Sequence, residues 1–386
     1  MALKVGKGAA APPFIVMDVI AAANARAARA TPTDPRVIRM EVGQPSTGAP
    51  RAAIEAAIAA MRAGETLGYT ETFGIRPLRE RIAQLYAERY GVAVDPARIA
   101  VTVGASGAFP LAFLAAFDPG DRVALASPYY PPYVNILEAL GLVPVLLEAG
   151  PESRFQPTVA MLERLDPPPD GLIVASPCNP AGTMLHADEL AALGAWCAQQ
   201  GVRLISDEIY HGLTYGEPAA TAAALPGAIV INSFSKYWSM TGWRVGWMVL
   251  PEDLVRPVER IASNLFISAP AVSQVAALAA FAATEELEAH RARYAANRAL
   301  LLDALPRAGI ARIAPAEGAF YLYADIGHLT NDSAGFCRRM LEEIAIAATP
   351  GVDFDRARGH RTIRFSFCGA TEDVAEAAER LSRWLG

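Results

Sequence analysis

The chain has 386 residues, of which 53% are hydrophobic and 19% charged, and its formal net charge is −6 at pH 7. This composition excludes a disordered chain, and the length predicts one large domain with a smaller one. The sequence contains no basic run that would suit nucleic acid and no apolar segment of the roughly 18 residues that a membrane span needs. We therefore expect neither nucleic acid nor a membrane as a partner.

The first thirty residues permit two interpretations. Lysines, an apolar stretch and an Ala-x-Ala site are typical of a secretory signal, but Pro12, Pro13 and Asp18 interrupt the apolar stretch. We therefore expect an amphipathic helix from Phe14 onward. The four cysteines and five histidines show no metal-binding spacing, and the cysteines show no disulfide-dense pattern, so we expect reduced thiols, a cytoplasmic protein and no metal.

From about residue 98, short β-branched runs alternate with helical patterns. The expected strands lie at 98–104, 122–128, 171–177, 203–208 and 228–233, and each is apolar on both faces, as buried parallel strands are. Helical stretches separate several of them, for example 187–201, which ends at a glycine. This alternation predicts an α/β domain with a mostly parallel sheet and helices on both faces.

After about residue 250 the pattern changes to long helices, notably within 273–305, followed by expected strands at 318–326 and 362–367 and a closing helix. These elements predict a second, smaller α+β domain, which the N-terminal segment is expected to join. We place the large domain at 46–280 and the small domain at 1–45 together with 281–386.

Ligands in mostly parallel sheets bind beyond the carboxyl ends of the strands. Five loops at such ends carry polar or aromatic residues, and they span 104–109, 127–133, 176–182, 206–212 and 233–238. Lys236 lies in the last of these loops among apolar and small hydroxyl residues. Apolar surroundings would lower the pKa of its amine and make it a nucleophile, although an isolated lysine is more often exposed on the surface.

Each of the other polar residues also has an ordinary structural interpretation. Asp207 ends an expected strand, where it would either meet a ligand or cap a helix. Tyr210 would serve for packing, Asn179 for turn formation between two prolines, and Arg244 for pairing with any acid. The small residues at 104–109 offer backbone N–H groups to an anion at a helix start, which is a weak signal by itself.

The order and spacing of these residues resemble the class I/II aminotransferases of pyridoxal-phosphate fold type I. The matching patterns are N-P-x-G at Asn179, D-x-x-Y at Asp207, and S-x-S-K at Ser233 with Arg244 eight residues after the lysine. The segments 69–83, 41–45 and 362–367 resemble further motifs of that family, so the resemblance covers nearly the whole chain. It implies a fold type I pyridoxal-phosphate transferase and a ping-pong transfer of an amino group between an L-amino acid and a 2-oxo acid.

The resemblance also implies a role for each matching residue. Lys236 would hold pyridoxal phosphate as a Schiff base and then move a proton as general acid and base. Asp207 would pair with the ring nitrogen, and Tyr210 and Asn179 would donate hydrogen bonds to the ring oxygen. Tyr130 would stack on the ring, with the adjacent Tyr129 as the alternative register.

Further residues are implied for the phosphate and for the substrate. The expected phosphate ligands are Ala105, Ser106, Ser233 and Arg244, with Tyr69 reaching the phosphate of a neighbouring subunit, which implies a homodimer with shared sites. Arg364 would bind the substrate carboxylate together with Gly43 and Asn179, and Arg361 is the competing candidate from spacing alone.

Substrate choice and reaction type stay open at this point. The expected helix around 108–117 carries no cation, which argues against a dedicated aspartate enzyme unless another loop or the partner subunit supplies one. Phe320 and Tyr321 would suit an apolar or aromatic substrate, or would serve only as a core strand. A C–S lyase or decarboxylase would keep the same motifs. A non-enzymatic sensor on this fold is expected to carry an N-terminal DNA-binding domain, for which some forty residues before the glycine loop are too few.

Overall fold

A computed structural model describes residues 3–386, and its largest sheet has seven strands. The strands are β2 (Ile99–Thr102), β3 (Arg122–Ser127), β4 (Val143–Glu148), β5 (Gly171–Ala175), β6 (Arg203–Asp207), β7 (Ile229–Ser233) and β8 (Gly246–Val249). Their order is β2-β8-β7-β6-β5-β3-β4, and each neighbouring pair is parallel except the two pairs that β8 makes. The predicted α/β architecture with a mostly parallel sheet is confirmed.

Helices cover both faces of this sheet. Side chains alternate along each strand, so that in β5 Leu172 and Val174 join one hydrophobic cluster and Ile173 joins a second one on the opposite face. The first cluster includes α3 (Arg76–Tyr90), α7 (Ala187–Gln200) and α9 (Ala271–Ala280), and the second includes α4 (Gly104–Ala116), α5 (Pro132–Ala139) and α8 (Glu252–Leu265). Burial on both sides explains why the strand sequences are apolar almost throughout.

The sequence predicted five of the seven strands, namely β2, β3, β5, β6 and β7. It missed β4, an edge strand that contains Pro144 and exposes Val143, and the short β8, which begins two residues after Arg244. The predicted helix at 187–201 is α7, and Gly201 ends it in the left-handed conformation with φ 70°. Two small helices, α2 (Arg51–Arg62) and α6 (Val159–Leu162), complete this part of the chain.

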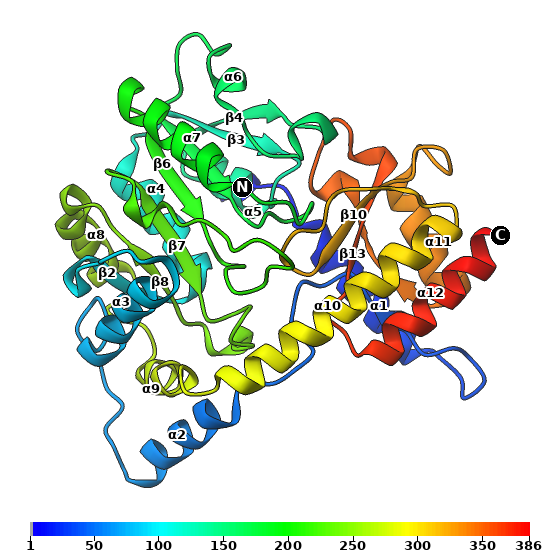
Figure 1. The fold of residues 1–386 in the computed structure, drawn as a ribbon, viewed down its shortest axis with the longest axis horizontal. Helices are drawn as coiled ribbons and strands as arrows, with labels where there is room; N and C mark the ends of the chain where they lie inside the picture. Colours follow the sequence, from blue (N-terminus) through cyan, green and yellow to red (C-terminus); the bar gives the residue numbers. More distant parts are fainter. Residues whose placement is uncertain (1–2) are drawn as a thin grey trace.

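The C-terminal third forms a separate group of elements. Its antiparallel sheet has the order β12 (Thr349–Pro350), β13 (Thr362–Ser366), β10 (Tyr321–Asp325) and β9 (Arg312–Ile313), and α11 (Ser333–Ile344) and α12 (Thr371–Leu385) lie beside it. The predicted helical stretch within 273–305 falls into α9 and the longer α10 (Thr284–Arg307), which runs from α9 toward α11 and α12 (Figure 1). The predicted strands at 318–326 and 362–367 correspond to β10 and β13.

The N-terminal segment lies with this C-terminal group. The predicted helix is α1 (Ile15–Ala28), which packs on α11, and β1 (Ile38–Arg39) pairs in parallel with β11 (Ile346–Ala347). The domain boundaries at 46–280, and at 1–45 with 281–386, stay a prediction, and residues 1 and 2 lie outside the described residues. Between residues 3 and 386, no helix is both long and apolar enough to cross a membrane.

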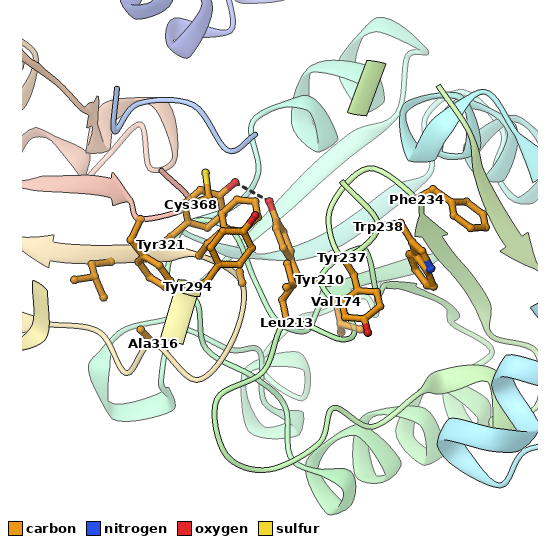
Figure 2. Packing of buried hydrophobic residues seen from close by; sticks show 14 of the residues in the cluster. Val174, Tyr210, Leu213, Phe234, Tyr237, Trp238, Tyr294, Ala316, Tyr321 and Cys368 are labelled. Carbon is orange, nitrogen blue, oxygen red and sulfur yellow. Dashed lines mark hydrogen bonds between the residues drawn. The ribbon is translucent and has the colours of Figure 1, made fainter. Parts of the chain in front are cut away.

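One hydrophobic core connects the two groups of elements. Figure 2 shows it extending from Phe234 and Trp238, next to the large sheet, through Tyr210 to Tyr294 and Tyr321. The hydroxyls of Tyr210 and Tyr321 are 2.7 Å apart, so a hydrogen bond joins the two groups within this core. The carboxyl ends of the parallel strands therefore meet the C-terminal group across a packed boundary.

Candidate active site

A cavity of about 760 Å³ lies at the carboxyl ends of the parallel strands. Residues from both groups of elements line it. Tyr69 and Ser233 were predicted for the site but do not line the cavity. The other predicted residues do line it, and they are Gly43, Ala105, Ser106, Tyr130, Asn179, Asp207, Tyr210, Lys236, Arg244 and Arg364. The structure thus brings together residues from at least five separate loops, as expected for a ligand site at this edge of such a sheet.

Lys236 lies in the turn after β7, and its Nζ donates a hydrogen bond of 2.5 Å to the carbonyl oxygen of Gly43. A side chain at position 43 would collide with Tyr321, because a Cβ atom there would lie 1.7 Å from the tyrosine hydroxyl. Burial lowers the pKa of the Lys236 amine to about 8. A minority of this amine is therefore neutral near pH 7, a far larger share than for an ordinary lysine, and is available as a nucleophile or base.

Asp207 ends β6 and is buried. Its Oδ2 accepts a hydrogen bond from the hydroxyl of Tyr133 in α5, and its Oδ1 accepts one of 3.0 Å from the Ile209 amide. Burial raises the pKa of this carboxyl to about 6, and the hydrogen bond from Tyr133 is the largest influence that opposes the rise. Asp207 is consequently an anion at neutral pH, deep in an otherwise apolar part of the cavity.

Arg364 in β13 is buried against two aromatic rings. Its guanidinium carbon lies 4.3 Å from the ring centre of Tyr321 and 4.6 Å from that of Phe354. Its Nη1 donates a 2.7 Å hydrogen bond to Oδ1 of Asn179, and Nη2 donates one of 3.1 Å to Thr349. Within residues 3–386, its buried Nε has no hydrogen-bond partner. Because Arg364 lines the cavity, its guanidinium offers a permanent positive charge to an anionic ligand there.

The competing residue Arg361 has a different environment. Its side chain is half exposed and pairs with Asp325 at 3.3 Å, outside the cavity. Of the two arginines, only Arg364 faces the site.

Arg244 and the start of α4 form a second cationic end of the cavity. The backbone of Arg244 is left-handed, with φ 53°. Its Nη1 donates a hydrogen bond of 2.8 Å to the Thr241 carbonyl, and its Nη2 lies 3.5 Å from the Ser106 hydroxyl. A Cβ atom at Gly104 would come within 2.6 Å of that Nη2, so glycine allows the guanidinium to lie against the helix start. Free backbone N–H groups beside a permanent cation suit a phosphate.

Two predicted residues lie elsewhere. Ser233 is fully buried behind Ser235, and its hydroxyl contacts the Ser235 hydroxyl at 2.9 Å and donates to the Val245 carbonyl at 3.1 Å. Ser235 lines the cavity in its place. Tyr69 is 83% exposed and lies outside the cavity of its own chain. A tyrosine that serves a neighbouring subunit would be placed in this way.

Aromatic residues line much of the remaining wall. Tyr130 lines the cavity and packs edge-on against Tyr133 and Phe14, whereas Tyr129 is buried outside the cavity, so the structure favours the Tyr130 register. Tyr321 likewise lines the cavity. Its neighbour Phe320 belongs to the core only.

The comparison with known proteins agrees with this geometry. The family model for aminotransferase class I and II matches residues 35–381. The chain belongs to this family. It is 49% identical to the valine–pyruvate aminotransferase of Mycobacterium tuberculosis over 99% of this chain and 98% of that protein, and 33% identical to the aspartate aminotransferase of Geobacillus stearothermophilus over 90% and 91%. A crystal structure of an aminotransferase from Mycobacterium tuberculosis superimposes with a TM-score of 0.96 at 48% identity, covering 100% of this chain and 99% of that one.

The protein is therefore an aminotransferase, and elimination, decarboxylation and ligand sensing are not favoured. The sequence did not predict several residues that line the cavity. Tyr133 lies three residues after Tyr130 in the same loop, yet only the structure shows its contact with Asp207. Ser235 directly precedes Lys236, whereas the resemblance implies Ser233, two residues earlier. The sequence predicted the amphipathic helix α1, but not that its apolar residues line the cavity.

Proposed function

We propose that this aminotransferase uses pyridoxal phosphate, and that the residues of the cavity hold it. The cavity offers a carboxylate at one end and a cation with free backbone N–H groups at the other, which matches a ring nitrogen and a phosphate on one molecule. Asp207 would pair with the ring nitrogen, while Arg244, Ser106, Ser235 and the start of α4 would hold the phosphate. Tyr130 would lie against the ring, and Tyr210 and Asn179 would donate hydrogen bonds to the ring oxygen.

Bound pyridoxal phosphate supplies a reactive aldehyde carbon and a ring that withdraws electrons from the substrate Cα. Lys236 would hold the cofactor through Nζ and, once the substrate amine has freed it, Nζ would move the proton that leaves the substrate Cα. Its pKa of about 8 suits both directions of proton movement near neutral pH. Asp207 stays anionic above a pH of about 6 and so keeps the ring nitrogen protonated.

Arg364 would bind the carboxylate that the amino acid and the 2-oxo acid share. Its Nη1 has two N–H groups and one protein partner, Asn179, so the guanidinium keeps a donor as well as its permanent charge for a carboxylate. The rings of Tyr321 and Phe354 fix the plane of the guanidinium before substrate arrives. Because one residue serves both half-reactions, the two substrates would use the site in turn, as a ping-pong cycle requires.

The amino donor that fits best has an uncharged, apolar side chain. Among residues 3–386, the charged side chains that line the cavity are those of Asp207, Lys236, Arg244 and Arg364, and each has a role above. A substrate carboxylate buried against the remaining apolar wall would lack a partner, which is strongly unfavourable. The name of the Mycobacterium tuberculosis relative, a valine–pyruvate aminotransferase, supports a small aliphatic donor and a 2-oxo acid such as pyruvate.

We further propose a homodimer with shared sites. The residue after the exposed Tyr69 is Thr70, whose hydroxyl accepts a hydrogen bond from Gln274 and whose amide donates one to the Ser268 hydroxyl. Because Ser268 directly follows the 265–267 segment, the Tyr69 loop lies next to that segment. Leu265, Phe266 and Ile267 there are 38 to 52% exposed, and a second copy would cover this apolar surface. The four cysteines are buried free thiols, which supports a reducing compartment such as the cytoplasm.

Covalent labelling tests the cofactor proposal. The chain has only three lysines, Lys4, Lys7 and Lys236, and only Lys236 lines the cavity. After incubation with pyridoxal phosphate and reduction with borohydride, mass mapping should find the label on the peptide that contains Lys236, with none in Lys236→Ala. A label confined to Lys4 and Lys7 would reject the proposed site.

A further inference from the structure

Helix α1 closes the apolar end of the cavity. Phe14 at its start, and Met17 and Ile20 within it, line the cavity and recur every three residues, so they form one stripe on the helix surface. Phe109 of α4 and Ile136 of α5 line the cavity from the large sheet. The space for a substrate side chain therefore has one wall that belongs to the N-terminal segment.

A single carboxylate fastens the start of this helix. The Ile15 amide donates a hydrogen bond of 3.0 Å to Oδ1 of Asp353, and the Val16 amide donates one of 3.1 Å to Oδ2. The residue before the helix, Phe14, has no side chain that can cap these amides. Asp353 is 5% exposed and lies more than 330 residues further along the chain, so it acts as a cap supplied by tertiary structure.

The segment before the helix is fixed to the other side of the cavity. The ring of Phe14 packs edge-on against Tyr130 with ring centres 5.8 Å apart, and Asn135 of α5 donates a hydrogen bond of 3.3 Å to the Pro12 carbonyl. The segment thus spans the cavity from α5 to Asp353. Met17 is 57% exposed, whereas Val19 and Ala23 on α1 pack against Leu341 of α11 and Ala347 of β11. The body of the helix is thus held by α11 and β11, and its first turn by Asp353.

We propose that Asp353 is a positioning residue that holds α1 as a wall of the substrate pocket and thereby sets the preference for aliphatic side chains larger than that of alanine. This inference rests on the proposed function. Asp353 touches neither reacting atom nor cofactor; it acts through Phe14, Met17 and Ile20. When the carboxylate is removed, the start of α1 loses two hydrogen bonds to a charged acceptor and the wall loosens.

The test compares straight-chain amino acids of increasing length, from alanine through 2-aminobutyrate and norvaline to norleucine, in the half-reaction of the pyridoxal-phosphate enzyme. In the wild type, kcat/KM should rise about fourfold for each methylene that contacts the wall. In Asp353→Ala this gain should fall below about twofold per methylene, while the rate with alanine stays within about twofold of wild type. Alanine controls for damage to Arg364 or to the cofactor site, since it has the shortest side chain of the series and so depends least on the wall.

Amide hydrogen exchange of residues 14–28 provides a readout independent of activity. Exchange should become faster in Asp353→Ala and should not change in Asp18→Asn, which removes an exposed carboxylate in the first turn of the same helix. If Asp353→Ala does not fold, Ile20→Ala replaces it, with Val19→Ala as its matched control, because Val19 lies in the same turn but not at the cavity.

The outcomes separate the two proposals. A wild type that reacts with none of these amino acids rejects the proposed substrate class, and the inference falls with it. If the wild type reacts but Asp353→Ala keeps the full gain per methylene despite faster exchange, α1 is not the wall that selects the substrate. Unchanged exchange in Asp353→Ala would show that Asp353 does not hold the helix.

Discussion

The hydroxyl of Tyr133 donates a hydrogen bond to Oδ2 of Asp207, and both side chains are buried. Burial disfavours the charged form of a carboxyl group, whereas a hydrogen bond donated to the carboxylate favours it. The two influences together leave the pKa of Asp207 at about 6, above its ordinary value but still below neutrality. Tyr133 thus keeps Asp207 anionic at the pH at which the proposed cofactor needs an anion next to its ring nitrogen.

We expect Tyr133→Phe to shift the acidic limb of the pH–rate profile. Loss of the hydrogen bond raises the pKa of Asp207 further, so the carboxylate is protonated, and activity lost, at a higher pH than in the wild type. A shift of roughly one pH unit or more is expected from the strength of a hydrogen bond to a charged group. The measurement is kcat/KM of the half-reaction between pH 5 and pH 9.

Tyr129→Phe is the matched control for this change. Tyr129 is a buried neighbour outside the cavity, and its hydroxyl has no hydrogen-bond partner within residues 3–386, so its removal should leave the acidic limb in place. Superimposable profiles for Tyr133→Phe and wild type would show that Tyr133 does not tune Asp207.

Arg364→Ala should weaken substrate binding far more than cofactor binding. The variant loses charge-assisted hydrogen bonds to the substrate carboxylate, so we expect KM for the amino acid to rise by about 10- to 100-fold. Arg361→Ala, which removes an arginine that is half exposed, should change KM less than about twofold. Steady-state kinetics together with titration of pyridoxal phosphate measure both quantities, and equal effects of the two substitutions would refute the assignment to Arg364.

Mixed subunits test whether Tyr69 serves the neighbouring chain. Tyr69→Ala and Lys236→Ala should each have low activity as homodimers. After subunit exchange, a heterodimer would contain one site with an intact Lys236 and an intact Tyr69 from its partner, so activity should reappear. If Tyr69 acted within its own chain, neither site of the heterodimer would be complete, and the mixture would show no more activity than its components.

The fold was predictable where the sequence pattern is local. Strands such as β5 and β6 are short apolar runs that end in polar loops, and those loops contain Asn179, Asp207 and Tyr210, which the structure brings to one cavity. The two strands that the sequence did not predict are β4 and β8. Pro144 and exposed positions obscure the pattern of the edge strand β4, and β8 runs directly on from the site loop with only four residues.

The missed site residues depend on contacts between distant parts of the chain. Asp353 and the amides of Ile15 and Val16 come together only after folding, and no local pattern marks an aspartate that caps a remote helix. The choice between Ser233 and Ser235 depends on which hydroxyl the turn after β7 directs to the cavity, which spacing alone does not determine. Sequence reasoning therefore located the chemistry better than the pocket that selects the substrate.

The most direct test of the account is the absorbance spectrum of the purified protein with pyridoxal phosphate, recorded before and after addition of valine or of aspartate without any acceptor. The account predicts that the visible band of lysine-bound cofactor converts to the ultraviolet band of the amine form with valine, that aspartate is much less effective, and that pyruvate restores the visible band. Conversion by aspartate in preference to valine would contradict the apolar pocket. A persistent visible band with both amino acids would contradict the proposed donor class.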